Sequence, residues 1–212
     1  MFFLTKDLFF PPAEEASYDG LLAIGGDLST ERLLLAYSSG IFPWFQQDEP
    51  ILWWSPPQRM VVVPQWYKTP KSIRNLINQN KFQITFNQDF EAVIKNCQQI
   101  FRPGQDGTWI TDDIVAAYIE LHRQGKAQSV EVWQNNELVG GLYGVDLGHV
   151  FCGESMFSKV SNASKIAFVS LVKYLHEKQY RLLDCQLHND YLEQLGAFEI
   201  SRDTFIKILK SV

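Results

Sequence analysis

The chain has few of the features that mark a secreted, membrane-embedded or disordered protein. Its 212 residues include an odd number of cysteines, three at wide spacing, which argues against a framework of disulfides: Cys97, Cys152 and Cys185. No apolar run approaches the roughly 18 residues that span a bilayer, and the opening MFFLTKDLFF lacks the basic start of a signal peptide. Charged residues are 20% and aromatic residues 14%, which excludes extended disorder. We therefore expect a folded, soluble, cytoplasmic protein.

Acidic residues outnumber basic ones, so the net charge of −5 excludes a protein that coats nucleic acid without specificity. One stretch departs from this balance, because residues 51–88 contain no acid and these bases: Arg59, Lys68, Lys71, Arg74 and Lys81. The same stretch contains Trp53, Trp54, Trp66 and Tyr67, so it could contact a phosphate backbone at one place. From the charges alone, we favour a solvated basic face.

Prolines and glycines divide the chain into two parts. Pro56, Pro57 and Pro64 predict a boundary near residues 60–68, which separates a small N-terminal domain, 1–62, from a larger domain, 63–212. In the first part, Ser29 is a candidate N-cap for a helix that stops at Gly40.

The larger part alternates between helical and strand patterns. We expect helices over 71–79, 88–98 and 111–122, a strand over 82–86, and a hairpin whose strands flank Gln134–Asn136. A third strand, a helix after Ser161 or Asn162, a strand over 181–187, a helical turn before Gly196 and a last strand over 198–209 complete the chain. This order predicts an α+β protein with a mixed, mostly antiparallel sheet. It resembles the GNAT acyltransferase fold, in which two central strands splay and leave a cleft.

Three polar residues near predicted strand ends are candidates for chemistry. Asp184 and Gln186 are two residues apart on one strand, so their side chains would share a face and could orient and deprotonate a nucleophile. A carboxylate that pairs near a sheet edge is an equally good explanation of Asp184. Glu154 follows Gly153 directly after an apolar strand, where a carboxylate suits a cationic ligand, although an ordinary turn acid is the simpler interpretation.

The residue spacing argues against a metal site, a phosphate-binding loop and a coenzyme A-binding turn. The residues Cys152, Cys185, His149 and His188 lack the paired spacing of a metal site, so we expect none. The glycines near residues 140–144 lie within the hairpin and match no phosphate-binding loop. A coenzyme A-binding turn would need glycine before the helix, and the junction SKVSNASKIA has none.

Tryptophans in turn-rich segments are harder to explain as core residues. Trp44 lies in FPWF, Trp53 and Trp54 precede Ser55-Pro56, and Trp109 lies in GTWIT. Aromatic side chains on connections are suited to stacking on an unpaired base.

Nearly the whole chain from Gly20 onward resembles the leucyl/phenylalanyl-tRNA–protein transferases. The resemblance rests on these segments in order: GLLAIGGDLS, GIFPWF, PILWWSP, GTWIT, AYIELHRQGKAQSVEVW, ELVGGLYGV, FCGESMFS, NASK and DCQ. It implies transfer of Leu or Phe, less often Met, from aminoacyl-tRNA to the N-terminal Arg or Lys of proteins, which marks them for degradation. It implies no cofactor, because the aminoacyl ester is already activated.

The resemblance also implies roles for individual residues. Asp184 and Gln186 would orient and deprotonate the attacking amine, and Glu154 would face the cationic end of the substrate. Trp44, Trp109 and Tyr118 would hold the terminal adenosine of the tRNA. An apolar pocket for the Leu or Phe side chain would be lined by Leu142, Phe151 and Leu183. The acceptor stem would follow Lys68, Lys71, Arg74 and Lys81.

Two other functions remain in view. One is a coenzyme A-dependent N-acetyltransferase, which the missing glycine turn disfavours. The other is a catalytically silent module that sequesters charged tRNA, which the pair Asp184 and Gln186 would distinguish from an enzyme. No heptad or flat apolar strand demands a partner, so we expect a monomer.

Overall fold

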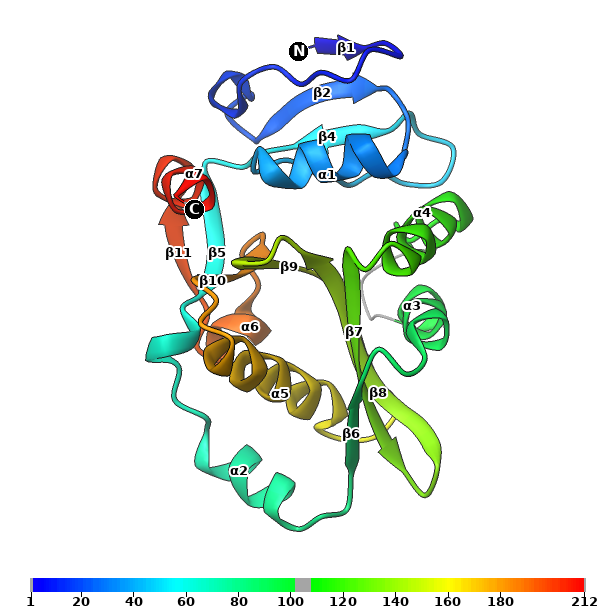
Figure 1. The fold of residues 1–212 in the computed structure, drawn as a ribbon, viewed down its shortest axis with the longest axis vertical. Helices are drawn as coiled ribbons and strands as arrows, with labels where there is room; N and C mark the ends of the chain where they lie inside the picture. The colour runs from blue at the N-terminus through cyan, green and yellow to red at the C-terminus, as the bar shows by residue number, and fades with distance from the viewer. Residues whose placement is uncertain (1, 102–107, 212) are drawn as a thin grey trace.

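A small four-stranded sheet forms the N-terminal part of the chain in the computed structural model, which describes residues 2–101 and 108–211 (Figure 1). Its strand order is β1-β2-β4-β3. The elements of this part are β1 (Phe2–Leu4), η1 (Ala13–Glu15), β2 (Leu21–Gly25), α1 (Thr30–Ser38), β3 (Phe42–Pro43) and β4 (Leu52–Trp54). As expected, Ser29 caps α1 by accepting a hydrogen bond from the backbone N–H of Arg32.

A seven-stranded sheet of order β11-β5-β10-β9-β8-β7-β6 forms the larger part. Its strands are β5 (Gln58–Val62), β6 (Gln83–Phe86), β7 (Ala127–Gln134), β8 (Glu137–Asp146), β9 (Val150–Ser158), β10 (Leu182–Gln186) and β11 (Phe198–Ser201). Among the described residues of this sheet, β9 and β10 are the one parallel pair, so the expected mixed, mostly antiparallel sheet is present. The predicted boundary at residue 62 falls too late, because β5 belongs to this sheet.

Helices cover both faces of the large sheet (Figure 1). One face carries α3 (Phe90–Gln99), α4 (Asp112–Arg123) and α7 (Arg202–Lys210). The other face carries η2 (Pro64–Trp66), α2 (Lys71–Asn78), α5 (Ala163–Glu177) and α6 (Asp190–Gln194). Asp89 and Thr111 cap α3 and α4 through their side chains, which places both helices close to their predicted positions.

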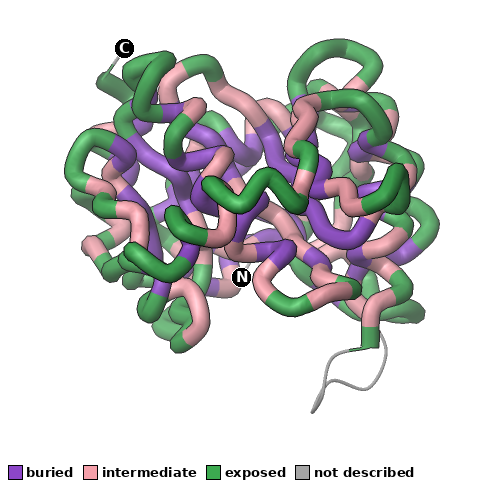
Figure 2. The backbone as a smooth tube through the Cα atoms, turned by 90° about the horizontal axis from the view of Figure 1, so that it is seen from below, coloured by how far each residue is buried: buried purple, intermediate pink, exposed green. Residues whose placement is uncertain are grey.

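The alternation of side chains along the strands produces two hydrophobic cores. Cys152 faces the core under α3 and α4, whereas its neighbour Phe151 faces the core under α5. The first core continues into the N-terminal sheet, where Leu33 and Trp53 are fully buried. Buried segments gather toward the centre of the molecule, and exposed segments lie mainly at its periphery (Figure 2).

The C-terminal segment differs from the predicted strand over 198–209. Only β11 is extended, and α7 (Arg202–Lys210) follows it. Ser201 caps this helix by accepting from the backbone N–H of Thr204, and Phe205, Ile206 and Leu209 form its buried face. These three apolar residues have the spacing of a helix face and lie buried on one side of α7. A segment with so many apolar residues is also compatible with a strand, which is why a strand was expected. None of the helices within the described ranges has the length and apolar character needed to cross a membrane.

Strands β9 and β10 separate soon after they meet. They pair only between Val150–Cys152 and Leu182–Asp184. Beyond this point the register of each strand with its other neighbour shifts, so that Glu154 and Cys185 are extra residues in bulges. Gln186 then has a φ of 64°, in the left-handed region. The expected splay of two central strands is thus present, and bulges on both strands turn Glu154 and Gln186 toward each other.

Candidate active site

A groove with a volume of about 1340 Å³ opens where β9 and β10 diverge. Trp44 from the N-terminal part and Trp109 from the segment before α4 line it, together with Glu154 and Gln186. A smaller cavity of about 90 Å³ adjoins the groove and shares Glu154 and Gln186 with it. The rest of the cavity wall is mainly apolar and includes Leu142, Met156, Phe168, Leu171 and Leu183. Glu154 and Gln186 therefore lie at the junction of an apolar cavity and a large groove.

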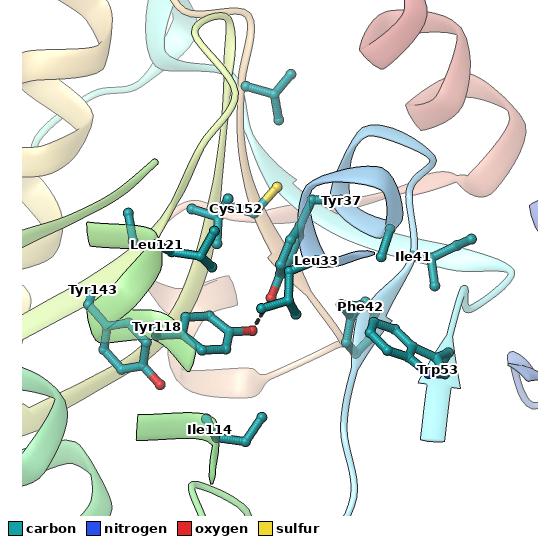
Figure 3. Close-up of a cluster of buried hydrophobic side chains, with 14 of the residues drawn as sticks. Leu33, Tyr37, Ile41, Phe42, Trp53, Ile114, Tyr118, Leu121, Tyr143 and Cys152 are labelled. Atoms are coloured by element: carbon teal, nitrogen blue, oxygen red, sulfur yellow. Dashed lines mark hydrogen bonds between the residues drawn. The ribbon is translucent and has the colours of Figure 1, made fainter. Parts of the chain in front are cut away.

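Three side chains from different elements hold the Glu154 carboxylate. Tyr37 Oη donates to Oε1 at 2.7 Å, Tyr118 Oη donates to Oε2 at 3.2 Å, and Gln186 Nε2 donates to Oε1 at 2.9 Å. The two tyrosine hydroxyls are also hydrogen-bonded to each other (Figure 3). This network joins α1 of the N-terminal part to α4 and to both diverging strands.

Burial dominates the electrostatics of this network. It raises the pKa of Glu154 to about 8, with a further contribution from the charge of Asp184, against the opposing effect of the hydrogen bonds from Tyr37, Tyr118 and Gln186. Burial also raises the pKa of Tyr37 and Tyr118 well above their usual range, so both hydroxyls keep their protons. Glu154 is therefore a carboxyl group that can gain or lose a proton near neutral pH.

Asp184 lies behind this network in an ion pair that is buried completely. Its two oxygens accept from Arg59 Nε at 2.9 Å and Arg59 Nη2 at 2.8 Å, and Oδ1 also accepts from the backbone N–H of Gln186 at 2.9 Å. With both oxygens engaged and no exposed surface, Asp184 cannot contact an attacking amine in this arrangement. Instead it fixes the backbone of Gln186.

The predicted adenosine contacts divide into two groups. Trp44 is 42% exposed and lies on the groove with the half-buried Trp109. Tyr118 is completely buried, so in this structure it cannot stack on a base. Its hydroxyl reaches the site only through Glu154 and Tyr37, so its expected role as an adenosine contact has to be revised.

The predicted apolar pocket is present in part. Leu142 and Leu183 line the small cavity, but Phe151 does not. The Phe151 ring instead fills the space beside Gly144, where an added Cβ would lie 2.4 Å from it. Sequence reasoning missed Phe168 and Leu171 of α5 and Tyr37 of α1, because apolar and aromatic residues at helical spacing predict only a core face.

Of the five basic residues in 51–88, Arg59 is not available to a ligand. Arg59 is buried and its guanidinium packs over the rings of Phe42 and Phe205, so it cannot contact a phosphate. The other four side chains are exposed on and around α2, and within the described ranges none of them takes part in an ion pair: Lys68, Lys71, Arg74 and Lys81.

The cysteines and histidines show no arrangement suited to nucleophilic catalysis. Burial raises the pKa of the Cys152 and Cys185 thiols well above the usual range, so neither is a thiolate at neutral pH. His149 Nε2 bonds to the backbone carbonyl of Leu209, and the exposed His188 bonds to Asp190.

The described helix junction also differs from a coenzyme A site. Asn162, with a φ of 68°, precedes α5, and its side chain makes no capping hydrogen bond. The junction before α5 contains no glycine, which disfavours pyrophosphate binding by its backbone N–H groups.

Comparison with known proteins gives one consistent result. Residues 61–210 match the family described as leucyl/phenylalanyl-tRNA protein transferase, and residues 26–57 match the N-terminal domain of that transferase. A transferase of this name from Flavobacterium johnsoniae is 61% identical and covers 100% of both chains. One from Christiangramia forsetii is 53% identical over 99% of this chain and 100% of its own length.

A crystal structure of FemX has the same fold over 81% of this chain and 66% of its own, with a TM-score of 0.52 and 10% identity. Full-length identity well above half, together with the matched family regions, decides the relationship. The chain belongs to the leucyl/phenylalanyl-tRNA–protein transferases, enzymes that transfer Leu or Phe from aminoacyl-tRNA to the N-termini of proteins.

Proposed function

We propose that this enzyme transfers Leu or Phe, and less often Met, to proteins that begin with Arg or Lys, and that the product is marked for degradation. We further propose that it works as a monomer in the cytoplasm without a cofactor. The observation that carries the proposal is the position of Glu154, whose carboxyl lies where the apolar cavity meets the groove. The ionised form of Glu154 at that junction favours an acceptor with a cationic end.

The apolar cavity supports the choice of amino acid. Leu142 and Leu183 offer no partner for a charged side chain, so the cavity favours apolar side chains. A difference of one methylene is worth only about 1–3 kcal/mol in such a pocket. Overlap among Leu, Phe and Met is therefore expected, with the terminal adenosine lying against Trp44 and Trp109 in the adjoining groove.

Gln186 supports a role in orienting the acceptor amine. Its Nε2 donates to Glu154 Oε1, so its own Oε1 is left to accept from an N–H of the amine. Asp184 acts through Gln186, because its carboxylate accepts from the Gln186 backbone N–H. Holding the amine beside the ester carbonyl lowers the barrier by orientation, which suits a substrate that is already activated.

The exposed bases support a contact with the tRNA body. Lys71 and Arg74 lie on α2 and Lys68 and Lys81 lie near its two ends. Four cations without carboxylate neighbours suit the phosphates of an acceptor stem, which positions the tRNA without reading its bases.

The test is transfer of radiolabelled leucine from charged tRNA to two peptides that differ only in their first residue, Arg or Ala. Label on the Arg peptide alone supports the proposal, and equal labelling contradicts the proposed acceptor specificity. Tight binding of charged tRNA without transfer would indicate a silent tRNA-binding module. Absence of both would leave acetyl transfer from coenzyme A as the activity to test. Light scattering at the assay concentration checks the monomeric state.

A further inference from the structure

The triangle of Glu154, Tyr37 and Tyr118 has a proton count that depends on the state of Glu154. Each side of the triangle is a hydrogen bond and needs one proton between its two oxygens. The two tyrosine hydroxyls supply two protons, one each. The third must come from Glu154, so all three hydrogen bonds form together only when its carboxyl group is protonated.

The surroundings of Glu154 favour the same state. Besides the two tyrosines, the titratable groups that face it are Cys152 on its own strand and Asp184 on β10. Tyr143 on β8 lies beside Tyr118, with a ring-centroid separation of 5.8 Å. Arg59 is the nearby cation, and it is already neutralised by Asp184. Burial therefore acts on Glu154 without a compensating positive charge.

Other groups near the groove are poorly placed to accept a proton from the substrate. Asp184 is enclosed behind Gln186 and has both oxygens bound. Cys152 is fully buried, and the Gln186 amide is not basic. Among the described residues that line the groove, His188 is also titratable, but it is exposed and bonded to Asp190, whereas Glu154 is bonded to Gln186.

We propose that Glu154 is the proton-transfer group of the reaction, and that Tyr37 and Tyr118 are positioning residues that hold its carboxyl group for that role. The inference rests on the proposed function, because it requires an α-ammonium group in the groove.

The proposed step balances as follows. The Glu154 carboxylate takes one proton from the acceptor ammonium, and the nitrogen lone pair forms the C–N bond while the carbonyl π electrons move to oxygen. As the carbonyl re-forms, the C–O bond to the ribose breaks, and Glu154 returns its proton to the leaving oxygen. A second proton leaves the nitrogen for solvent, which yields a neutral amide.

The α-amine of the acceptor and Glu154 have similar pKa values, so proton transfer between them has a small free-energy cost. A free α-amine has a pKa of about 7.7–8.0, and the pKa of Glu154 is raised to about 8. A carboxylate of ordinary acidity would bind the ammonium but leave it protonated and unreactive.

The first test is independent of transfer. Infrared titration of the ligand-free enzyme should show a protonated carboxyl band at neutral pH that disappears with a midpoint near pH 8. Glu154→Gln should lack this band. A titration without a protonated carboxyl at neutral pH, or with the band unchanged in Glu154→Gln, overturns the inference even if the Arg and Ala peptides are distinguished as proposed.

The second test is the pH profile of kcat with a saturating Arg peptide. Tyr37→Phe removes the hydrogen bonds of Tyr37 to both Glu154 and Tyr118, so the triangle can no longer form and the midpoint of the rising limb should shift by about 0.5–1 unit. Tyr180→Phe is the matched control, since Tyr180 also donates to a carboxylate, that of Asp146, at a different place. A uniform loss of rate with an unmoved midpoint would contradict the proposed role of Tyr37.

Glu154→Gln separates proton transfer from simple attraction of the cation. Loss of the proton acceptor should lower kcat by about 100-fold or more with a smaller change in KM. A raised KM with an unchanged kcat would show that Glu154 only attracts the cation. Equal use of Arg and Ala peptides by the wild-type enzyme would count against the proposed acceptor specificity and leave the infrared result standing.

Discussion

Gln186 combines an unusual backbone conformation with a bound side chain. Its φ of 64° is uncommon for a residue with a Cβ, and its conformation is held by Asp184 at the backbone and Glu154 at the amide. A sharp local geometry supported from both sides is typical of a residue whose orientation matters to the reaction. Gln186 is therefore better placed than Asp184 to contact the amine.

Replacing Gln186 should affect transfer much more than tRNA binding. We expect Gln186→Ala to lower kcat by about 100-fold or more, because the oriented acceptor for the amine is lost, with little change in the Kd for aminoacyl-tRNA. Gln179→Ala is the matched control, since Gln179 is also a glutamine with a positive φ, 60°, at an exposed turn. Near-normal transfer by Gln186→Ala would exclude the proposed role.

Asp184 should contribute to stability through Arg59. Removing one partner leaves the other charge buried alone, so Asp184→Ala should lower the free energy of unfolding by about 3–5 kcal/mol in urea titrations. The double variant Arg59→Met/Asp184→Leu should recover part of this loss. Asp184→Asn keeps an oxygen for the Gln186 N–H and should retain measurable transfer, whereas complete inactivity of a folded Asp184→Asn enzyme would favour a catalytic base.

Glu154 should make stability fall as pH rises. Its pKa is about 8 in the folded protein against 4.5 as the reference, so the folded state binds the proton more tightly. This contribution is fully present below pH 4.5 and is lost as pH rises to about 8. Between these values the free energy of unfolding of the wild type should fall by up to about 1.4 kcal/mol per pH unit relative to that of Glu154→Gln. Parallel curves of stability against pH for Glu154→Gln and the wild type would contradict the raised pKa.

Among the elements, those with a cap and a clear period were predictable. Ser29, Asp89 and Thr111 are N-caps in the structure, and each begins a helix close to its expected position. The prediction failed at residues 198–209, because FEISRDTFIKIL is apolar enough for a strand throughout. The decisive signals are local, with Ser201 as a cap and Phe205 and Leu209 four residues apart.

The bulges on β9 and β10 could not be predicted from the sequence. They depend on register with neighbouring strands, which a period of two along one strand does not reveal. Alternation predicted that Asp184 and Gln186 share a face, but the extra residue Cys185 interrupts it. The site could therefore be predicted as a set of strand-end residues but not as a geometry.

Helix α2 and its flanks should determine the salt dependence of tRNA binding. If Lys68, Lys71, Arg74 and Lys81 contact phosphates, changing all four to alanine should reduce the slope of log K against log salt by up to about 3–4. Filter binding of charged tRNA at several salt concentrations measures this slope. A control variant changes to alanine two other exposed lysines that do not line the groove, Lys173 of α5 and Lys178 at its C-terminal end. An unchanged slope in the quadruple variant would make the stretch a solvated surface.

The two parts of the molecule meet in one active site. Tyr37 comes from α1, and the Glu154 carboxylate that it contacts is 117 residues further along the chain. Arg59 and Asp184 are 125 residues apart. Contacts of this separation leave no trace in a local pattern, which is why the sequence indicated a core helix at Tyr37 and grouped Arg59 with the other bases of residues 51–88.

A shared core predicts that the N-terminal part and the large sheet unfold together. Leu33 is fully buried in the core that both contribute to (Figure 3), so Leu33→Ala should cost about 2–5 kcal/mol. Tryptophan fluorescence, to which Trp44, Trp53 and Trp54 of the N-terminal part contribute, and far-UV circular dichroism should follow one coincident transition in urea.

Leu175→Ala, in the separate core under α5, should shift the same single transition. Two resolved transitions, of which Leu33→Ala moves only one, would contradict a shared core. In that case Tyr37 could leave Glu154 without global unfolding, and the proton-transfer network would be a contact between independently folding parts. A single transition instead means that any substitution in the core around Leu33 acts on Glu154 through the whole fold.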